Sequence, residues 1–216
     1  TIKTSEKKQC EKTSDPIEWI ENYYKKFNVF SDSTLPEFQG GLVGYFGFDS
    51  IKYFEPKIVP SSQVDQLNTP DIRLIISKQI LIFDKINNKI FIIVYSDAST
   101  EGYNEAIGEI SNLHELITKF RVKQDSNTYP KHDDIKVDYH MNKSNFIKSV
   151  DSIKSYISDG DVMQVVLSQR MTVPFKNDAL AFYKQLRNLN PSPYMYYLNL
   201  DGFIIIGSSP EILVRL

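Results

Sequence analysis

The feature that most constrains the fold is a pair of apolar runs on either side of Asp201-Gly202, close to the last residues of the sequence. Asp-Gly between two apolar runs is typical of a β-hairpin, because glycine tolerates the positive φ that a tight turn needs. We therefore predict strands over residues 194–200 and 203–207. The second strand contains four consecutive apolar residues, 203–206, and this run predicts a central strand that is covered on both faces.

A carboxylate follows the second of these strands. The sequence GSSPE, residues 207–211, turns the chain and leaves Glu211 at the strand end. Burial raises the pKa of a carboxyl group, so a carboxylic acid beside a buried strand is a candidate general acid. The alternative is a turn carboxylate that accepts hydrogen bonds from backbone N–H groups.

A third predicted strand lies upstream, in GDVMQVVLSQR, residues 160–170. Its alternation puts Gln164 on the same face as a hydroxyl and a guanidinium, those of Ser168 and Arg170. Polar groups inside a sheet layer need hydrogen-bond partners, and a ligand can supply them. The alternative is a half-solvated strand face over residues 162–170.

The segment between these strands predicts a short helix over residues 177–189, capped by Asn177 or Asp178. Asn190-Pro191-Ser192-Pro193 must end it, because each proline removes a donor and restricts the residue before it. The predicted buried stripe of this helix consists of Leu180, Tyr183, Leu186 and Leu189.

The rest of the sequence alternates between helical and strand patterns. Ser144 is the expected cap of the helix that precedes Gly160. Helices are predicted over residues 16–27, 101–121 and 144–159, and strands over residues 40–48, 72–83 and 90–95. The order of these elements predicts an α+β fold with largely antiparallel sheets. Residues 124–137 are polar, contain Pro130 and form the best linker candidate.

Composition excludes several classes of protein. The formal net charge of −2 argues against a nucleic-acid-binding protein, which usually has a basic face. No apolar run is long enough to cross a membrane. Cys10 is the only cysteine, so no internal disulfide forms, as expected for a cytoplasmic protein. His114, His132 and His140 have no metal-ligand spacing, and we assign no catalytic histidine and no metal ligand in this chain.

Five separated stretches carry a resemblance to a known family. GDVMQVVLSQR, NPSPYM (190–195) and GSSPE, in this order, resemble the chorismate-binding enzymes and, within them, the large subunit of anthranilate synthase, also called component I. The sequences GGLVGYFGFDSIKYFE and PDIRLIISKQILIFDKINNKIFIIV are similar to the same family. Several motifs in order are far more specific than one short motif.

The resemblance implies an activity and two catalytic residues. The family converts chorismate to anthranilate and pyruvate, with ammonia from a glutamine amidotransferase partner and with Mg2+. Glu211 matches the general acid that protonates the hydroxyl departing from C4 of chorismate. Gln164 matches the position that faces the incoming nucleophile, where relatives that add water carry a lysine. An amide cannot deprotonate water, but ammonia brings its own lone pair, so Gln164 favours an ammonia-using enzyme.

The resemblance also implies regulation by tryptophan. NPSPYM is similar to the feedback pocket of the same subunit, with Asn190, Pro193, Tyr194 and Met195 as the binding residues. Two prolines fix the backbone, and the side chains of Tyr194 and Met195 suit an indole ring. The alternative is a rigid connector between a helix and a strand, which needs no ligand.

The resemblance also implies that the antiparallel sheets are layered with outer helices, and it implies a domain organisation. Residues 1–137 resemble the N-terminal region of component I, and residues 138–216 the first part of the chorismate-binding region, truncated after SSPE. The family's metal-binding glutamates and active-site histidine follow that motif, so we expect these residues alone to be inactive. Two other functions stay open: the related aminodeoxychorismate synthase of the folate pathway, and a non-catalytic tryptophan-binding module.

Overall fold

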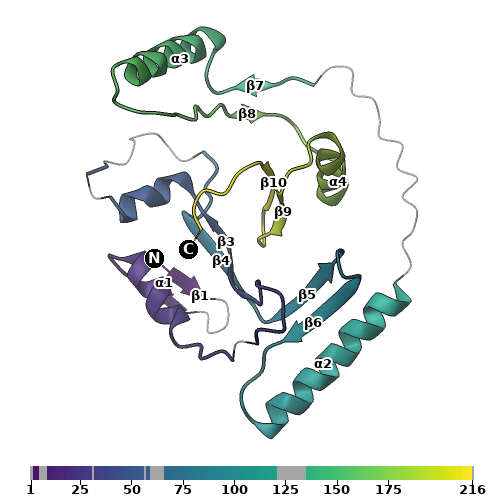
Figure 1. Cartoon of the computed structure of the whole chain (residues 1–216). Helices are drawn as coiled ribbons and strands as arrows, with labels where there is room; N and C mark the ends of the chain where they lie inside the picture. The colour runs from purple at the N-terminus through teal and green to yellow at the C-terminus, as the bar shows by residue number, and fades with distance from the viewer. Residues whose placement is uncertain are drawn as a thin grey trace. The chain divides into compact units, whose positions relative to one another are not determined.

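The computed structural model of the chain describes residues 2–4, 9–30, 32–55, 57–58, 66–120 and 135–215. The chain divides into two compact units, Thr1–Lys123 and Gln124–Leu216 (Figure 1). The predicted α+β class with antiparallel sheets is confirmed, because every strand pair in these ranges is antiparallel and helices accompany the pairs. The domain boundary after residue 137 stays a prediction, and most of the predicted linker lies outside the described residues.

The described residues of the first unit form two helices, a 3-10 helix and three pairs of strands. In chain order its elements are β1 (Ile2–Thr4), β2 (Gln9–Glu11), α1 (Pro16–Tyr24), β3 (Gly41–Phe46), η1 (Phe48–Tyr53), β4 (Ile72–Ser77), β5 (Gln79–Asp84), β6 (Lys89–Val94) and α2 (Thr100–Lys119). The β1–β2 pair was not expected from a polar and charged sequence. The predicted strand over residues 40–48 is shorter, because the chain turns into η1 after Gly47.

Two strand pairs of this unit are linked through β4 and β5, which are separated by Lys78 alone, and each pair forms its own two-stranded sheet. We predicted one continuous strand over residues 72–83, and the structure breaks it at this residue. β3 pairs with β4, and β6 pairs with β5. The N–H group of Tyr95 donates to the carbonyl oxygen of Lys78 at 2.9 Å, which extends the β5–β6 ladder to the break. Asn88, in the turn between β5 and β6, has a φ of 53°, and the register pairs Asp84 with Lys89.

Helix α2 packs against β6 and runs along the β5–β6 pair (Figure 1). Its N-terminus is capped by the Ser99 hydroxyl, which accepts from the N–H group of Gly102 at 2.9 Å. The apolar face of this helix is only partly covered. Ala106 is 8% exposed, whereas Ile107 and Phe120 are 46% and 73% exposed.

The second unit contains α3, α4 and two pairs of strands. Its elements are β7 (Asp138–Tyr139), α3 (Lys143–Ser158), β8 (Met171–Thr172), α4 (Ala179–Leu189), β9 (Tyr194–Asn199) and β10 (Ile204–Ser209). The N-cap of α3 is Asn142 and not the predicted Ser144, whose hydroxyl donates to the Asn142 side chain at 2.8 Å. Asp178 caps α4, as one of the two predicted candidates.

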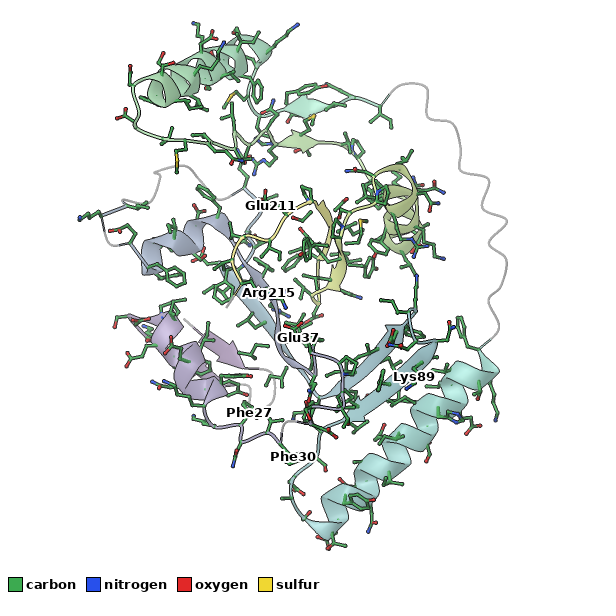
Figure 2. The ribbon with its side chains drawn as sticks, in the orientation of Figure 1. Phe27, Phe30, Glu37, Lys89, Glu211 and Arg215 are labelled. Atoms are coloured by element: carbon green, nitrogen blue, oxygen red, sulfur yellow. The ribbon has the colours of Figure 1, made fainter. Side chains whose placement is uncertain are left out.

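Fully buried apolar side chains are few among the described residues, namely Ala106, Ala181 and Leu200. Many large apolar side chains lie on the surface instead, such as Phe48 at 93% and Met163 at 97% exposure. Phe27 and Phe30, on the segment after α1, are also exposed (Figure 2). Each unit therefore leaves large apolar side chains on its surface, where a partner surface can cover them.

Among the helices that the structure describes, none combines the length and the apolar character that crossing a bilayer demands.

Candidate functional site

The β9–β10 hairpin carries most of the predicted site, and its turn forms as the sequence predicts. Asp201 and Gly202 have φ values of 52° and 103°, and the N–H group of Leu200 donates to the carbonyl oxygen of Phe203 at 3.0 Å. The register places Ile204 opposite Asn199 and Ser209 opposite Tyr194. The hairpin prediction is confirmed.

The predicted burial of the second strand is not observed. β10 has β9 as its single paired neighbour within the described ranges, so it is an edge strand there. Ile204 is 40% exposed, although its apolar run predicted cover on both faces. A run of apolar residues favours burial, but burial also needs a neighbouring element that packs on the strand. In the described part, helix α4 packs on this hairpin and leaves Ile204 partly exposed.

The candidate acid Glu211 lies two residues after β10 ends at Ser209 (Figure 2). Its side chain is exposed, so the partly buried carboxyl group that we expected is not present. The Ser209 hydroxyl donates to the carbonyl oxygen of Glu211 at 3.0 Å and closes the turn. This bond fixes the backbone that carries the carboxylate.

The NPSPYM segment joins α4 to β9 and touches the turn that leads to Glu211. The N–H group of Asn190 donates to the carbonyl oxygen of Leu186 at 2.8 Å and ends the helix. The carbonyl oxygen of Asn190 accepts a 2.6 Å hydrogen bond from the Ser208 hydroxyl. The predicted feedback segment and the predicted acid segment are therefore in direct contact.

Of the remaining predicted tryptophan-binding residues, Met195 is half-buried, whereas Pro193 and Tyr194 are exposed. Tyr194 and Met195 pair with Ser209 and Ser208 across the hairpin. The hydroxyl oxygen of Ser192 is buried and has no hydrogen-bond partner in the described part.

The predicted strand over residues 162–170 is not formed, and Gln164 is exposed. A strand needs a neighbour that takes its backbone hydrogen bonds, and in the described part no backbone hydrogen bond joins residues 162–169 to another segment. In the same part, no hydrogen bond links Gln164 to Glu211. The structure brings together the feedback and acid segments but not the predicted nucleophile-facing residue.

In the described part, pairing begins at Arg170, where four hydrogen bonds connect residues 169–172 to His140 and Met141, directly after β7. The carbonyl oxygen of Arg170 accepts from the N–H group of His140 at 3.1 Å. The Arg170 guanidinium donates to Nδ1 of His140 at 2.7 Å, which leaves Nε2 of a neutral ring to donate to Thr172 Oγ1 at 3.2 Å. Gln169 also donates to the carbonyl oxygen of Met141 at 2.7 Å. Sequence spacing gives no signal for a cluster whose members lie 30 residues apart.

A second unpredicted cluster lies in the first unit. Oδ2 of Asp71 accepts from Lys52 Nζ at 2.7 Å and from the Tyr53 hydroxyl at 2.6 Å. The hydrogen bonds from Lys52 and Tyr53 lower the pKa of the Asp71 carboxyl group. The same Asp71 hydrogen bond raises the pKa of Lys52 and, with burial, that of Tyr53. The three side chains form hydrogen bonds with one another, so the cluster connects η1 to Asp71, the residue before β4.

No metal centre is formed by the described residues, because no three His, Cys, Asp or Glu side chains among them gather in a suitable arrangement. These residues therefore do not fit a Mg2+ site on their own. His132 lies outside the described residues.

Comparison with known proteins places the chain in a family. The model of a family described as chorismate binding enzyme matches residues 1–216. The chain is 37% identical to anthranilate synthase component 1 of Acinetobacter calcoaceticus over 214 residues, which cover 94% of this chain and 42% of that protein. It is 42% identical to the protein of the same name from Aquifex aeolicus (strain VF5) over 209 residues, with the same two coverages.

A solved structure is also similar. The crystal structure of anthranilate synthase component I from Streptococcus pneumoniae TIGR4 matches with a TM-score of 0.71 and 28% identity, over 91% of this chain and 44% of that one. The chain thus spans about two fifths of the length of the relatives it matches. Since the family model extends over all 216 residues, the chain belongs to the chorismate-binding enzyme family.

Proposed function

We propose that these residues belong to the large subunit of anthranilate synthase, a cytoplasmic enzyme that converts chorismate and ammonia to anthranilate and pyruvate in tryptophan biosynthesis. The similarity to component 1 proteins over 94% of the chain carries this proposal. The match of the chorismate-binding family model, over residues 1–216, includes the segments of Gln164, Asn190 and Glu211, so the proposal does not depend on one motif.

Glu211 is the proposed general acid. Its role is to protonate the hydroxyl that leaves C4 of chorismate, which requires a carboxyl group that holds a proton at the moment of bond cleavage. In the described structure the side chain is exposed, and its backbone is held by Ser209. Bound substrate would supply the cover that raises the proton affinity of such a group.

Gln164 is the proposed residue that faces the nucleophile. Its amide cannot act as a base, so this position suits ammonia and not water. Ammonia comes from glutamine through an amidotransferase partner in this proposal. The exposed, unpaired segment around Gln164 leaves the side chain accessible from solvent.

Asn190, Pro193, Tyr194 and Met195 form the proposed tryptophan feedback site. The rigid segment between α4 and β9 presents backbone groups at little ordering cost. Mg2+ is the proposed cofactor. The described residues provide no ligand set for it, so no step is assigned to the metal here.

The direct test of this assignment replaces Glu211 with glutamine in the polypeptide extended to the length of its relatives. The amide has no titratable proton, so anthranilate formation is expected to fall by roughly 10²- to 10⁴-fold. Glu211→Asp is expected to retain part of the activity. Glu105→Gln, on the exposed side of α2, is the matched control and should leave the rate unchanged. A Glu211→Gln enzyme that works at the wild-type rate would remove Glu211 from the proposed mechanism.

A further inference from the structure

The turn that carries Glu211 is tied to the C-terminal end of α4 by one side chain. Ser208 is half-buried in β10, and its hydroxyl donates to the carbonyl oxygen of Asn190 at 2.6 Å. The last carbonyl groups of a helix have no partner within the helix. The Ser208 hydroxyl supplies a hydrogen-bond donor for the carbonyl oxygen of Asn190, the C-cap residue of α4, which lies 18 positions earlier in the sequence.

The opposite face of the same strand is also fixed. A Cβ atom at Gly207 would lie 2.1 Å from Cζ of Tyr196, so the tyrosine ring lies directly over this glycine, its cross-strand neighbour. Tyr197 lies on the other face, where its ring contacts Tyr183 of α4 with centroids 6.0 Å apart. Ser208 pairs with Met195, which shares the face of Tyr197. The end of β10 is thus held on both faces at consecutive positions.

The restraint continues to the candidate acid. The Ser209 hydroxyl donates to the carbonyl oxygen of Glu211 at 3.0 Å. A continuous path of contacts therefore runs from Asn190 through Ser208 and Ser209 to the backbone of Glu211. A misplacement of about 1 Å is enough to reduce catalysis strongly, so a residue that sets this turn affects the rate without touching the substrate.

We propose that Ser208 is a positioning residue for Glu211. It anchors the end of β10 to the C-terminus of α4 and thereby holds the turn that carries Glu211. The proposal rests on the proposed role of Glu211 as general acid. It predicts that loss of the Ser208 hydroxyl loosens the turn and lowers kcat, while KM for chorismate stays close to the wild-type value. A role in stability alone would not separate kcat from KM.

The experiment compares Ser208→Ala with Ser208→Thr, which keeps the hydroxyl, in the polypeptide extended to the length of its relatives. Ser111→Ala is the matched control, because it removes an equivalent hydroxyl that donates to the Ile107 carbonyl oxygen at 2.9 Å within α2. We expect Ser208→Ala to lower kcat about tenfold, the effect of one lost hydrogen bond on the barrier. We expect near-wild-type kcat for Ser208→Thr and Ser111→Ala.

Hydrogen exchange gives a second readout that does not need activity. The amide hydrogens of residues 211–213 should exchange faster in Ser208→Ala than in the wild type. Their exchange rates should be unchanged in Ser111→Ala. Equal exchange and equal kcat in Ser208→Ala and the wild type would overturn the proposal, and so would a threonine variant as impaired as the alanine one. If the wild-type polypeptide forms no anthranilate, the proposed function is contradicted. The exchange rates of residues 211–213 in Ser208→Ala and the wild type still test whether Ser208 restrains the turn.

Discussion

Asp71 is the residue whose ionisation is most clearly tied to the fold. Its carboxylate accepts from Lys52 and Tyr53, and these hydrogen bonds lower its pKa below the ordinary value of 3.8. A lowered pKa in the folded state means that folding favours the ionised form. This contribution to stability is therefore fully present above the ordinary pKa and is lost as the pH falls through the folded pKa.

Replacing Asp71 with asparagine should lower the free energy of unfolding by about 1 kcal/mol at pH 7, with allowance for the partial solvent exposure of the ion pair. The loss should shrink below pH 3.8, because the wild-type carboxyl group is then protonated as well. Urea denaturation at pH 7 and in acid measures both values. Asp49→Asn, on the exposed side of η1, is the control. A pH-independent difference would contradict the assigned role of the charge.

Two glycines give opposite expectations for the same substitution. A Cβ atom at Gly44 would lie 1.9 Å from the carbonyl oxygen of Arg73 on the paired strand β4, so the backbone would have to move. At Gly108, in the middle of α2, nothing lies within 4 Å of the added carbon. Gly44→Ala should destabilise the protein by roughly 1–3 kcal/mol. Gly108→Ala should stabilise it by roughly 0.5–1 kcal/mol, since alanine is the better helix former.

Thermal or urea unfolding of the two variants against the wild type measures this pair. A Gly44→Ala variant at least as stable as the wild type would contradict the close approach of β3 to β4, and a destabilised Gly108→Ala variant would contradict the open space at α2.

At the scale of elements, the cap of α4 provides a test of local structure. The sequence left Asn177 and Asp178 as alternatives, and the structure selects Asp178, whose carboxylate accepts from the N–H group of Ala181 at 2.7 Å. Asp178→Ala should cost about 1 kcal/mol in unfolding free energy, the usual loss for a helix cap. Asn177→Ala is the adjacent control and should change it little. A larger loss for Asn177→Ala would reverse the assignment.

Elements with local causes could be predicted from the sequence. The caps, the apolar spacing and the glycine at residue 160 placed α3 and α4 to within a few residues. Asp201-Gly202 alone fixed the β9–β10 hairpin. Pro16 marked the first turn of α1. In each case the residues that indicate the element lie in it or within a few residues of it, so the prediction does not depend on a distant partner.

Elements that depend on distant partners could not be predicted. The alternation over residues 162–170 indicated a strand, but a strand forms only where a neighbour pairs with it, and Gln164 stays exposed. The Asp71 and His140 clusters join residues 18 to 32 positions apart, and no local pattern marks them. Of the candidate site, the contact between Asn190 and Ser208 joins residues 18 positions apart, one of them outside the paired strands, and no local pattern marks it.

At the scale of the whole molecule, the two units expose much apolar side-chain surface. Phe48 in the first unit and Val166 in the second are 93% and 83% exposed, and few apolar residues are fully buried in the described ranges. The relatives that match are more than twice as long as the matched region. The test of the proposed activity therefore uses a polypeptide extended to the length of its relatives.

The measurement that tests the central claim most directly is the identification of the product. The extended polypeptide is incubated with chorismate, Mg2+ and an ammonium salt at alkaline pH, and the products are analysed by liquid chromatography and mass spectrometry. The proposed function predicts anthranilate and pyruvate in equal amounts. Accumulation of aminodeoxychorismate, which keeps the pyruvyl group, or chorismate left unchanged would contradict it.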